Sequence, residues 1–207
     1  MNPAKICYNG AFYTESDCIF GASNKSYRYG DGFFETLRVW KGNIQLAAYH
    51  KTRIQKSIDT LNYSWPPHVN IDKIFTEVKL LCDKNNCLPS ARVRLSFSGG
   101  EGGLYDGDSK MTYLIEAWPL DTAISNLNIN GLVTGFCPLV KKSCDQIANL
   151  KSASALLYSV AAQYARQQQW NDCIILNHRE NICETTIANL FWIQDGAIYT
   201  PSLTEGC

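Results

Sequence analysis

The chain has 207 residues, which is enough for one large domain or two small ones. Hydrophobic residues make up 45% of it and charged residues 18%, the balance of an ordinary folded protein rather than a disordered one. Nineteen basic side chains balance nineteen acidic ones. The chain therefore has no global field to attract nucleic acid or an anionic membrane, and we expect it to bind neither.

The apolar runs are short, such as residues 190–193, and none could span a bilayer. Residues 1–10 contain no apolar stretch of signal-peptide length, so we expect a cytoplasmic protein. Nine cysteines are scattered without a Cys-x-x-Cys pair and without metal-ligand spacing to the three histidines. We expect reduced thiols, most of them buried as small apolar side chains, and no metal site.

The first half of the chain predicts hairpins followed by helices. Asn9-Gly10 between two strand-like runs is a strong signal for a two-residue hairpin turn. Apolar residues at helical spacing predict two helices, the second of them with Asn70 as its N-cap. Period-two alternation and apolar runs predict the strands. In chain order, the expected elements are strands 5–8 and 11–14, a strand pair from 33–40 through 41–43 to 44, helices 47–61 and 71–82, and strands 91–97 and 111–118.

The second half of the chain begins after a polar, aperiodic stretch that predicts a linker. We expect an α+β fold with an N-terminal domain of residues 1–119, a linker of residues 120–128 and a C-terminal domain of residues 129–207. The elements expected after the linker are a strand over 129–136, a helix over 152–169, a short strand over 173–176 and a hairpin that turns at Asp195-Gly196.

Lys151 directly precedes the predicted helix 152–169. The partial positive charge of a helix N-terminus would lower the pKa of its ammonium group and favour the neutral amine. A neutral amine can attack an aldehyde and form a Schiff base. Judged alone, however, a lysine at this place is more often a solvated side chain.

Three further features could bind a ligand. Glu184, between two predicted strands, could keep a pyridine nitrogen protonated, although an exposed turn glutamate is the commoner case. Arg53 lies beside the apolar stripe of its helix and could donate two hydrogen bonds to a phosphate, although most arginines at a helix flank are solvated. Arg92 and Arg94 share one face of their strand and could bind a carboxylate, or they could simply face solvent.

Six segments, taken in order, resemble the class IV aminotransferase family, the fold type IV enzymes that use pyridoxal 5′-phosphate (PLP). The resemblance implies that Lys151 binds PLP as a Schiff base and moves the substrate proton. It also implies that Glu184 faces the pyridine nitrogen and that Arg53 binds the phosphate. The matching segments are Tyr8-Asn9-Gly10, residues 29–38, His50-x-x-Arg53, residues 91–95, Asn149-Leu150-Lys151-Ser152, and Glu184-Thr185-Thr186-x-x-Asn189-x-Phe191.

The resemblance further implies a two-domain fold with PLP between the halves, a homodimer, and a substrate contacted by Phe34, Arg38 and Arg94. Residues 30–36 look more like 4-amino-4-deoxychorismate lyases and D-amino-acid transaminases than branched-chain transaminases. Family members usually continue past the segment that corresponds to residues 200–207, so we expect an incomplete C-terminal domain. The predicted function is therefore that of an aminotransferase or lyase, and the alternative is a PLP-deficient homologue that acts as a binding or scaffold protein.

Overall fold

The computed structural model describes residues 4–106 and 110–207. Their contacts divide the chain into two compact units. The first contains the residues up to Leu127 together with Lys151–Ser154, and the second contains Asn128–Leu150 and Ala155–Cys207. The sequence placed residues 151–154 in the C-terminal domain, whereas their contacts group them with the first unit.

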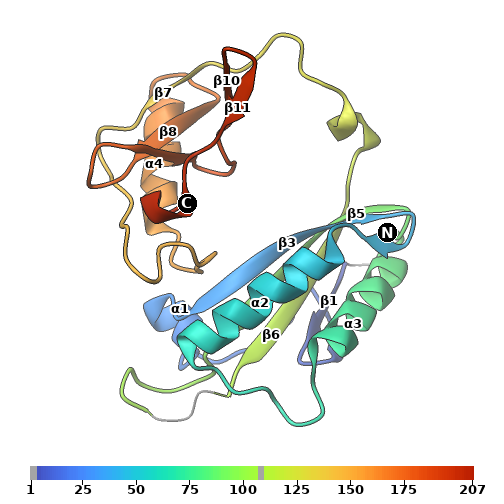
Figure 1. The fold of residues 1–207 in the computed structure, drawn as a ribbon. Coiled ribbons are helices and arrows are strands. Elements are labelled where there is room, and N and C mark those ends of the chain that lie inside the picture. Colours follow the sequence, from blue (N-terminus) through green and yellow to red (C-terminus); the bar gives the residue numbers. More distant parts are fainter. Residues whose placement is uncertain (1–3, 107–109) are drawn as a thin grey trace. The chain divides into compact units, whose positions relative to one another are not determined.

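The first unit contains a six-stranded antiparallel sheet with the strand order β2-β1-β6-β5-β3-β4 (Figure 1). The Asn9-Gly10 hairpin is confirmed, and both turn residues have positive φ, as such a turn requires. The strands are β1 (Lys5–Tyr8), β2 (Ala11–Thr14), β3 (Gly32–Trp40), β4 (Asn43–Ile44), β5 (Ser90–Ser98) and β6 (Thr112–Pro119).

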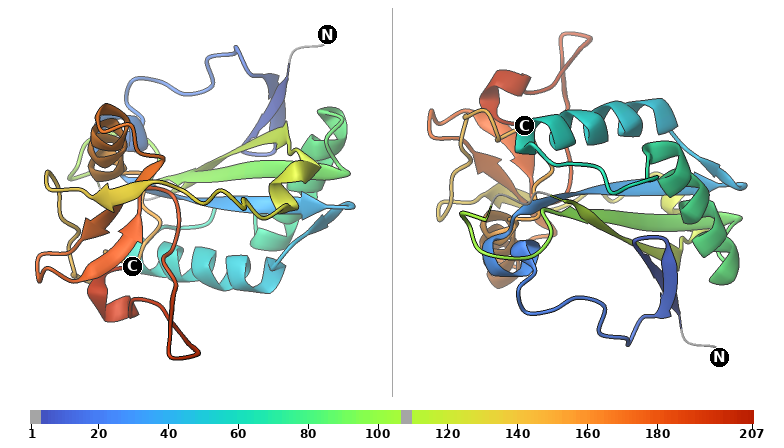
Figure 2. Two further views of the ribbon diagram at one scale, coloured as in Figure 1. Left: turned by 90° about the horizontal axis from the view of Figure 1, so that it is seen from above. Right: turned by 90° about the horizontal axis from the view of Figure 1, so that it is seen from below.

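Two amphipathic helices, α2 (Ala47–Leu61) and α3 (Ile71–Lys84), pack on this sheet and bury their apolar faces against it (Figure 2). The first helix has the bounds that its periodicity predicts. The second is capped as predicted, because the Asn70 side chain accepts a hydrogen bond from the Lys73 amide at 2.9 Å. A short helix that the sequence did not reveal, α1 (Lys25–Tyr29), precedes β3.

The pleat of β3 separates two sets of side chains. Phe33, Leu37 and Val39 are buried in the core beneath the helices, and Glu35, only 1% exposed, lies in the same alternation. The intervening residues, among them Phe34 and Arg38, are only partly buried on the other face of the strand. That second face of β3 therefore carries two of the residues assigned to the substrate.

The second unit contains a three-stranded sheet of β7 (Thr134–Phe136), β8 (Asp172–Leu176) and β9 (Ile182–Thr185), with β7 parallel to β8. The helix α4 (Leu156–Gln167) connects these two parallel strands and packs on β8. The predicted hairpin forms between β10 (Trp192–Gln194) and β11 (Ala197–Tyr199). Two short 3₁₀ helices, η1 (Thr122–Ser125) and η2 (Leu203–Glu205), lie in the first and the second unit respectively.

Three expectations about the second half of the chain were wrong. The helix expected from residue 152 begins at Leu156, because residues 152–154 group with the first unit instead. The strand expected over 129–136 spans only Thr134–Phe136. Glu184 lies within β9 rather than between strands, because the polar sequence around it concealed a strand that pairs with β8.

All nine cysteines are free thiols, and six of them are buried, which agrees with the expected reduced, apolar role. Within the described residues, no helix has the length and apolar content needed to cross a membrane.

Truncation of Ile74 should test the helix-covered core. This side chain is fully buried on α3, so Ile74→Ala should lower the free energy of unfolding by about 2–5 kcal/mol. Leu80→Ala on the same helix removes a side chain that is 49% exposed and should change stability by only about 0.5 kcal/mol. Urea unfolding measures both values, and equal losses would contradict the assignment of the buried face.

Candidate active site

The segment that carries Lys151 is held against β3 by backbone hydrogen bonds. The Phe34 amide donates to the Lys151 carbonyl at 2.9 Å, and the Ala153 amide donates to the Gly32 carbonyl at 2.8 Å. Gly32 itself is required by the neighbouring strand β5, because a Cβ at this position would lie 2.4 Å from the Phe97 carbonyl oxygen. Lys151 is thus positioned by a strand-like pairing and not by a helix N-terminus, so the predicted effect of the helix field on its amine has no structural basis.

The side chain of Phe34 brings two of the predicted cationic residues together. The Lys151 Nζ atom lies 4.7 Å from the centre of its ring, and the Arg94 Cζ atom lies 3.7 Å from it. Both distances suit cation–π contacts. Arg94 also donates from Nε to Ser96 Oγ at 3.2 Å, and among the described residues its two terminal nitrogens have no hydrogen-bond partner and could bind an anion. Lys151, Phe34 and Arg94 therefore form one cluster on the first unit.

Arg53 joins α2 to β3 through the buried carboxylate of Glu35. Its Nε donates to Oε1 and its Nη2 to Oε2, both at 2.5 Å, and His50 Nδ1 lies 2.9 Å from Oε2. Burial alone would raise the pKa of Glu35, but the hydrogen bonds and positive charge of Arg53, together with the His50 contact, lower it overall. Glu35 therefore stays ionised and fixes the plane of the guanidinium group.

The bidentate pair leaves part of the Arg53 guanidinium group for a second anion. Neither contact with Glu35 uses Nη1, which carries two hydrogens. The side chain is also 48% exposed, so these hydrogens can reach solvent or a ligand. The predicted phosphate contact is compatible with this geometry.

Arg38 lies farther along β3 and has different partners. It donates from Nη2 to Ser125 Oγ at 3.0 Å and stacks on Trp40 with its Cζ 5.3 Å from the ring centre. Its Nε is the one buried side-chain polar atom without a hydrogen-bond partner among the described residues. Arg92 stands directly opposite in the sheet register, so two like charges face one another there.

Glu184 belongs to the second unit, where two side chains meet its Oε1 atom. Lys142 Nζ donates to Oε1 in a close ion pair, and the Tyr158 hydroxyl donates to the same oxygen at 2.6 Å. Lys142 Nζ also donates to the Tyr158 hydroxyl at 2.9 Å, which closes a triangle of three polar side chains. Within the described part of the chain, the second oxygen, Oε2, has no hydrogen-bond partner.

The sequence did not identify the partners of these charged residues. The four-residue span from His50 to Arg53 places both on one helix turn, so their shared contact with one carboxylate could have been anticipated. The period-two alternation of β3 could have placed Glu35 on the buried face. Nothing in the local pattern around Lys142 or Tyr158 distinguishes them from surface residues, because their meeting depends on the packing of α4 against the small sheet.

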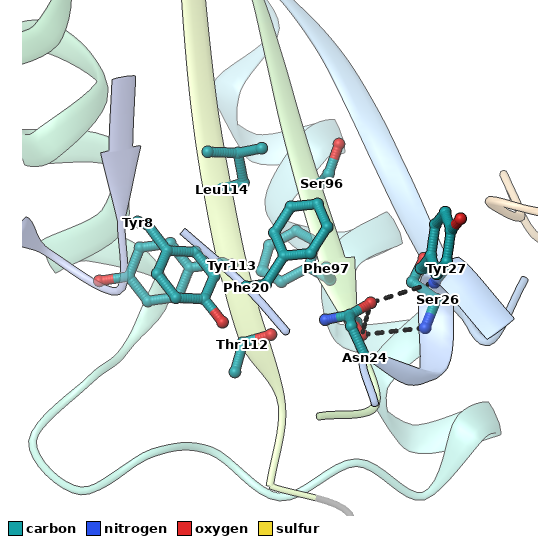
Figure 3. Close-up of a pocket in the computed structure, with 11 residues that line it drawn as sticks. Tyr8, Phe20, Asn24, Ser26, Tyr27, Ser96, Phe97, Thr112, Tyr113 and Leu114 are labelled. Carbon is teal, nitrogen blue, oxygen red and sulfur yellow. Dashed lines mark hydrogen bonds between the residues drawn. The ribbon is translucent and has the colours of Figure 1, made fainter. Parts of the chain in front are cut away.

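A pocket on the first unit opens near the same sheet but contains none of the six predicted site residues. Figure 3 shows aromatic rings on its wall and the Asn24 side chain, which accepts a hydrogen bond from the Tyr27 amide (3.1 Å). Ser98 Oγ also donates to Asn24 Oδ1 at 3.4 Å. The pocket includes Ser96, which also binds Arg94. Its lining residues are Tyr8, Phe20, Asn24, Ser26, Tyr27, Ser96, Phe97, Ser98, Thr112, Tyr113 and Leu114.

Comparisons with known proteins agree with this fold. A family model described as amino-transferase class IV matches residues 32–207. The aminodeoxychorismate lyase of Bacillus subtilis is 28% identical over 97% of this chain and 68% of its own length. The chain spans about two thirds of the length of the curated relatives it matches.

Two solved structures show the same architecture at low sequence identity. The branched-chain amino acid aminotransferase of Escherichia coli matches 99% of this chain and 70% of its own, with a TM-score of 0.84 at 21% identity. A hypothetical aminotransferase from Mycobacterium tuberculosis in a PLP-bound form matches 98% and 72%, with a TM-score of 0.78 at 18% identity. These likenesses confirm the expected fold class.

Neutralising Glu35 should change how stability depends on pH. Because its pKa is lower in the folded protein than in the unfolded chain, its stabilising contribution is complete above about pH 4.3 and is lost as the pH falls through the folded pKa. Glu35→Gln should therefore lower the free energy of unfolding by about 1–3 kcal/mol at neutral pH. The free energy of unfolding of this variant should also fall less steeply than that of the wild-type protein as the pH is lowered.

The control for this experiment is Lys51→Gln on the same helix, which breaks an exposed ion pair with Asp72 and should cost less than about 1 kcal/mol. The stability of both variants is measured by urea unfolding between about pH 3 and pH 7, a range that includes the ordinary pKa of a carboxyl group. If the free energy of unfolding fell equally steeply with decreasing pH in Glu35→Gln and in the wild-type protein, the role given to Glu35 would be contradicted.

Proposed function

Because the chain belongs to the amino-transferase class IV family, we propose that it is a PLP-dependent enzyme that acts on an amino-acid-type substrate. The observation that carries the proposal is the Lys151 amine, fixed by backbone pairing to β3 beside Phe34 and Arg94. The amine is thus carried by a segment that is hydrogen-bonded to β3, and it contacts the same aromatic ring as an anion-binding side chain. This is the arrangement that a nucleophilic lysine and its substrate require.

The residues present fit the chemical groups of PLP. Arg53 has two N–H groups for the phosphate and is held in one plane by Glu35. Glu184 has an uncommitted oxygen, Oε2, that can accept a hydrogen bond from a protonated pyridine nitrogen. Lys151 supplies the amine to which the aldehyde of PLP would be joined. When bound, PLP supplies an electron sink for the substrate carbon next to the amino group.

The chain's own residues would divide the work in a simple way. The Lys151 Nζ atom would take the proton from the substrate Cα and return it at a later step. Arg94, stacked on Phe34, would bind a substrate carboxylate through its terminal nitrogens, and Arg38 would supply a second cationic contact. The ring of Phe34 would contact the amine of Lys151 and restrict its position.

The substrate class is supported by the relatives and by one short stretch of β3. The Bacillus relative is named a lyase of aminodeoxychorismate, and the Escherichia neighbour is named a branched-chain aminotransferase. Residues 30–36 look more like the lyases and the D-amino-acid transaminases, so we propose elimination from an aminodeoxychorismate-like substrate or transamination of a small amino acid. A homodimer and a cytoplasmic location stay predictions from the family resemblance.

Lys151→Ala should abolish covalent attachment of PLP. Wild-type protein incubated with PLP should develop the visible absorbance of lysine-linked pyridoxal, and borohydride should then fix the label on the peptide that contains Lys151. Lys79→Ala removes an exposed lysine on α3 and serves as the matched control with unchanged labelling.

Two results would count against this proposal. An unchanged absorbance band in Lys151→Ala would show that another lysine carries the cofactor. Folded wild-type protein without any band would favour the alternative, a binding or scaffold protein that has kept the fold. A panel of L- and D-amino acids and an aminodeoxychorismate substrate would separate transfer from elimination.

Arg53→Met should weaken the binding of PLP about tenfold or more, because a charge-assisted bidentate contact is worth at least about 1.4 kcal/mol. Pyridoxal without the phosphate should bind the variant and the wild-type protein equally well, which separates a phosphate contact from a general loss of structure. Equilibrium titration of the absorbance measures both ligands. An equal loss for PLP and pyridoxal would contradict the assigned phosphate contact, because the loss would then not depend on the phosphate.

A further inference from the structure

Lys142 is a buried cation that the proposed chemistry has not used. Its side chain is 10% exposed and its Nζ atom lies between the Tyr158 hydroxyl and Oε1 of Glu184. Glu184 itself is only 15% exposed. Burial by itself works against the charged form of Lys142, but the hydrogen bonds to Glu184 and Tyr158 and the attraction of the carboxylate raise its pKa overall. The ammonium group is therefore charged throughout the neutral range.

The backbone of Lys142 holds this ammonium in a defined position. The Lys142 amide donates to the Leu176 carbonyl at 2.9 Å, and the His178 amide donates to the Lys142 carbonyl at 3.2 Å. These bonds pair residue 142 with the end of β8, the central strand of the small sheet. The neighbouring strand β9 carries Glu184. The two charged side chains thus come from segments that flank β8.

A purely structural role would not need a charge at this place. Transferring two charged groups from water into the protein interior costs more free energy than transferring an apolar pair of similar size. Buried ion pairs can therefore often be replaced by apolar residues without loss of stability. The adjacent Lys141 shows the ordinary alternative, because its ion pair with Glu180 is exposed on both sides (39% and 63%). Lys142 instead forms an ion pair with Glu184, the carboxylate to which the proposed function assigns the contact with the pyridine nitrogen.

We propose that Lys142 is a positioning residue that sets how strongly Glu184 stabilises the proton on the pyridine nitrogen. This inference rests on the proposed function. Its ammonium group binds Oε1 and leaves Oε2 for the ring nitrogen. Its positive charge also offsets part of the carboxylate's charge, so the ring holds a proton less tightly than it would beside an unpaired glutamate. Lys142 therefore limits how far the ring is protonated and how strongly it withdraws electrons.

The other titratable groups around this pair stay neutral at ordinary pH. Tyr158, from α4, faces both charges, and burial followed by its hydrogen bond to Glu184 raises the pKa of its hydroxyl. Cys183 on β9 also feels both charges, and burial raises the pKa of its thiol to about 12. Burial raises the pKa of the Cys207 thiol as well. A change in ring protonation on substitution of Lys142 can therefore be assigned to the lost ammonium.

The test follows the ring nitrogen itself. The protein is loaded with PLP labelled with ¹⁵N at the pyridine nitrogen, and the ¹⁵N chemical shift is measured against pH for the wild-type protein, Lys142→Gln and Lys142→Arg. Lys142→Gln should raise the midpoint of ring deprotonation by about one to two pH units, because a unit charge a few ångströms away is lost. Lys142→Arg keeps the charge and should titrate within a few tenths of a unit of the wild-type protein, on the order expected for a retained ion pair.

Lys141→Gln is the matched control, since it removes an exposed lysine next in the chain and should leave the midpoint unchanged. Lys142→Met provides a second neutral variant if the glutamine variant does not fold, because an apolar side chain leaves no buried amide without a partner. Wild-type midpoints in folded, PLP-linked Lys142→Gln or Lys142→Met would overturn this inference alone. Absence of linked PLP in the wild-type protein would overturn the proposed function, and this inference with it.

Discussion

The hydrogen bonds between the Glu35 carboxylate and the Arg53 guanidinium group connect helix and sheet in the first unit, and the candidate site depends on them. Glu35 belongs to the buried face of β3, so its charge is sustained only while Arg53 and His50 reach it from α2. The same pleat that buries Glu35 turns its neighbour Phe34 to the other face. One strand thereby supports the predicted phosphate ligand on one side and the predicted amine and carboxylate contacts on the other.

The two units stabilise a buried negative charge in the same way. Each contains a mostly buried carboxylate, Glu35 or Glu184, and each carboxylate is held by one strong cation and one weaker hydrogen-bonding partner. In both, one member of the pair keeps unused hydrogen-bonding capacity: Nη1 of Arg53 in the first unit and Oε2 of Glu184 in the second. A pair that is partly satisfied internally and partly open is well suited to bind a charged ligand without rearranging.

Much of the first unit could be predicted because its signals are local. The turn at Asn9-Gly10 and the periodicity and cap of α3 depend on neighbours within a few residues, so the sequence alone specified them. The start of α4 could not be predicted in this way. Residues 151–154 have helix-compatible side chains, but their backbone groups bind β3, which lies more than a hundred residues away in the chain. Tertiary hydrogen bonds outweighed local propensity there.

The roles of the candidate residues were accessible from the sequence only through the family resemblance. The helix field that made a reactive Lys151 plausible from the sequence is absent, because α4 begins only at Leu156, and the position of this lysine has a different physical basis. Glu184 was expected in a turn and lies on a strand, where its neighbours are fixed more firmly. Lys142 was missed because a lysine in a loop-like stretch gives no sign of the aromatic and acidic side chains that packing brings to it.

The grouping of Lys151–Ser154 with the first unit also constrains how this protein could evolve by exchange of modules. A fragment that ends at the natural boundary near Leu127 would contain β3 but not the lysine that pairs with it. The following segment would have to supply, in register, a carbonyl that accepts from the Phe34 amide and an amide that donates to the Gly32 carbonyl. Gene recombination at the apparent border between the units would therefore join β3 to a lysine segment from another protein. The amine would be positioned correctly only if β3 and that segment still matched in register.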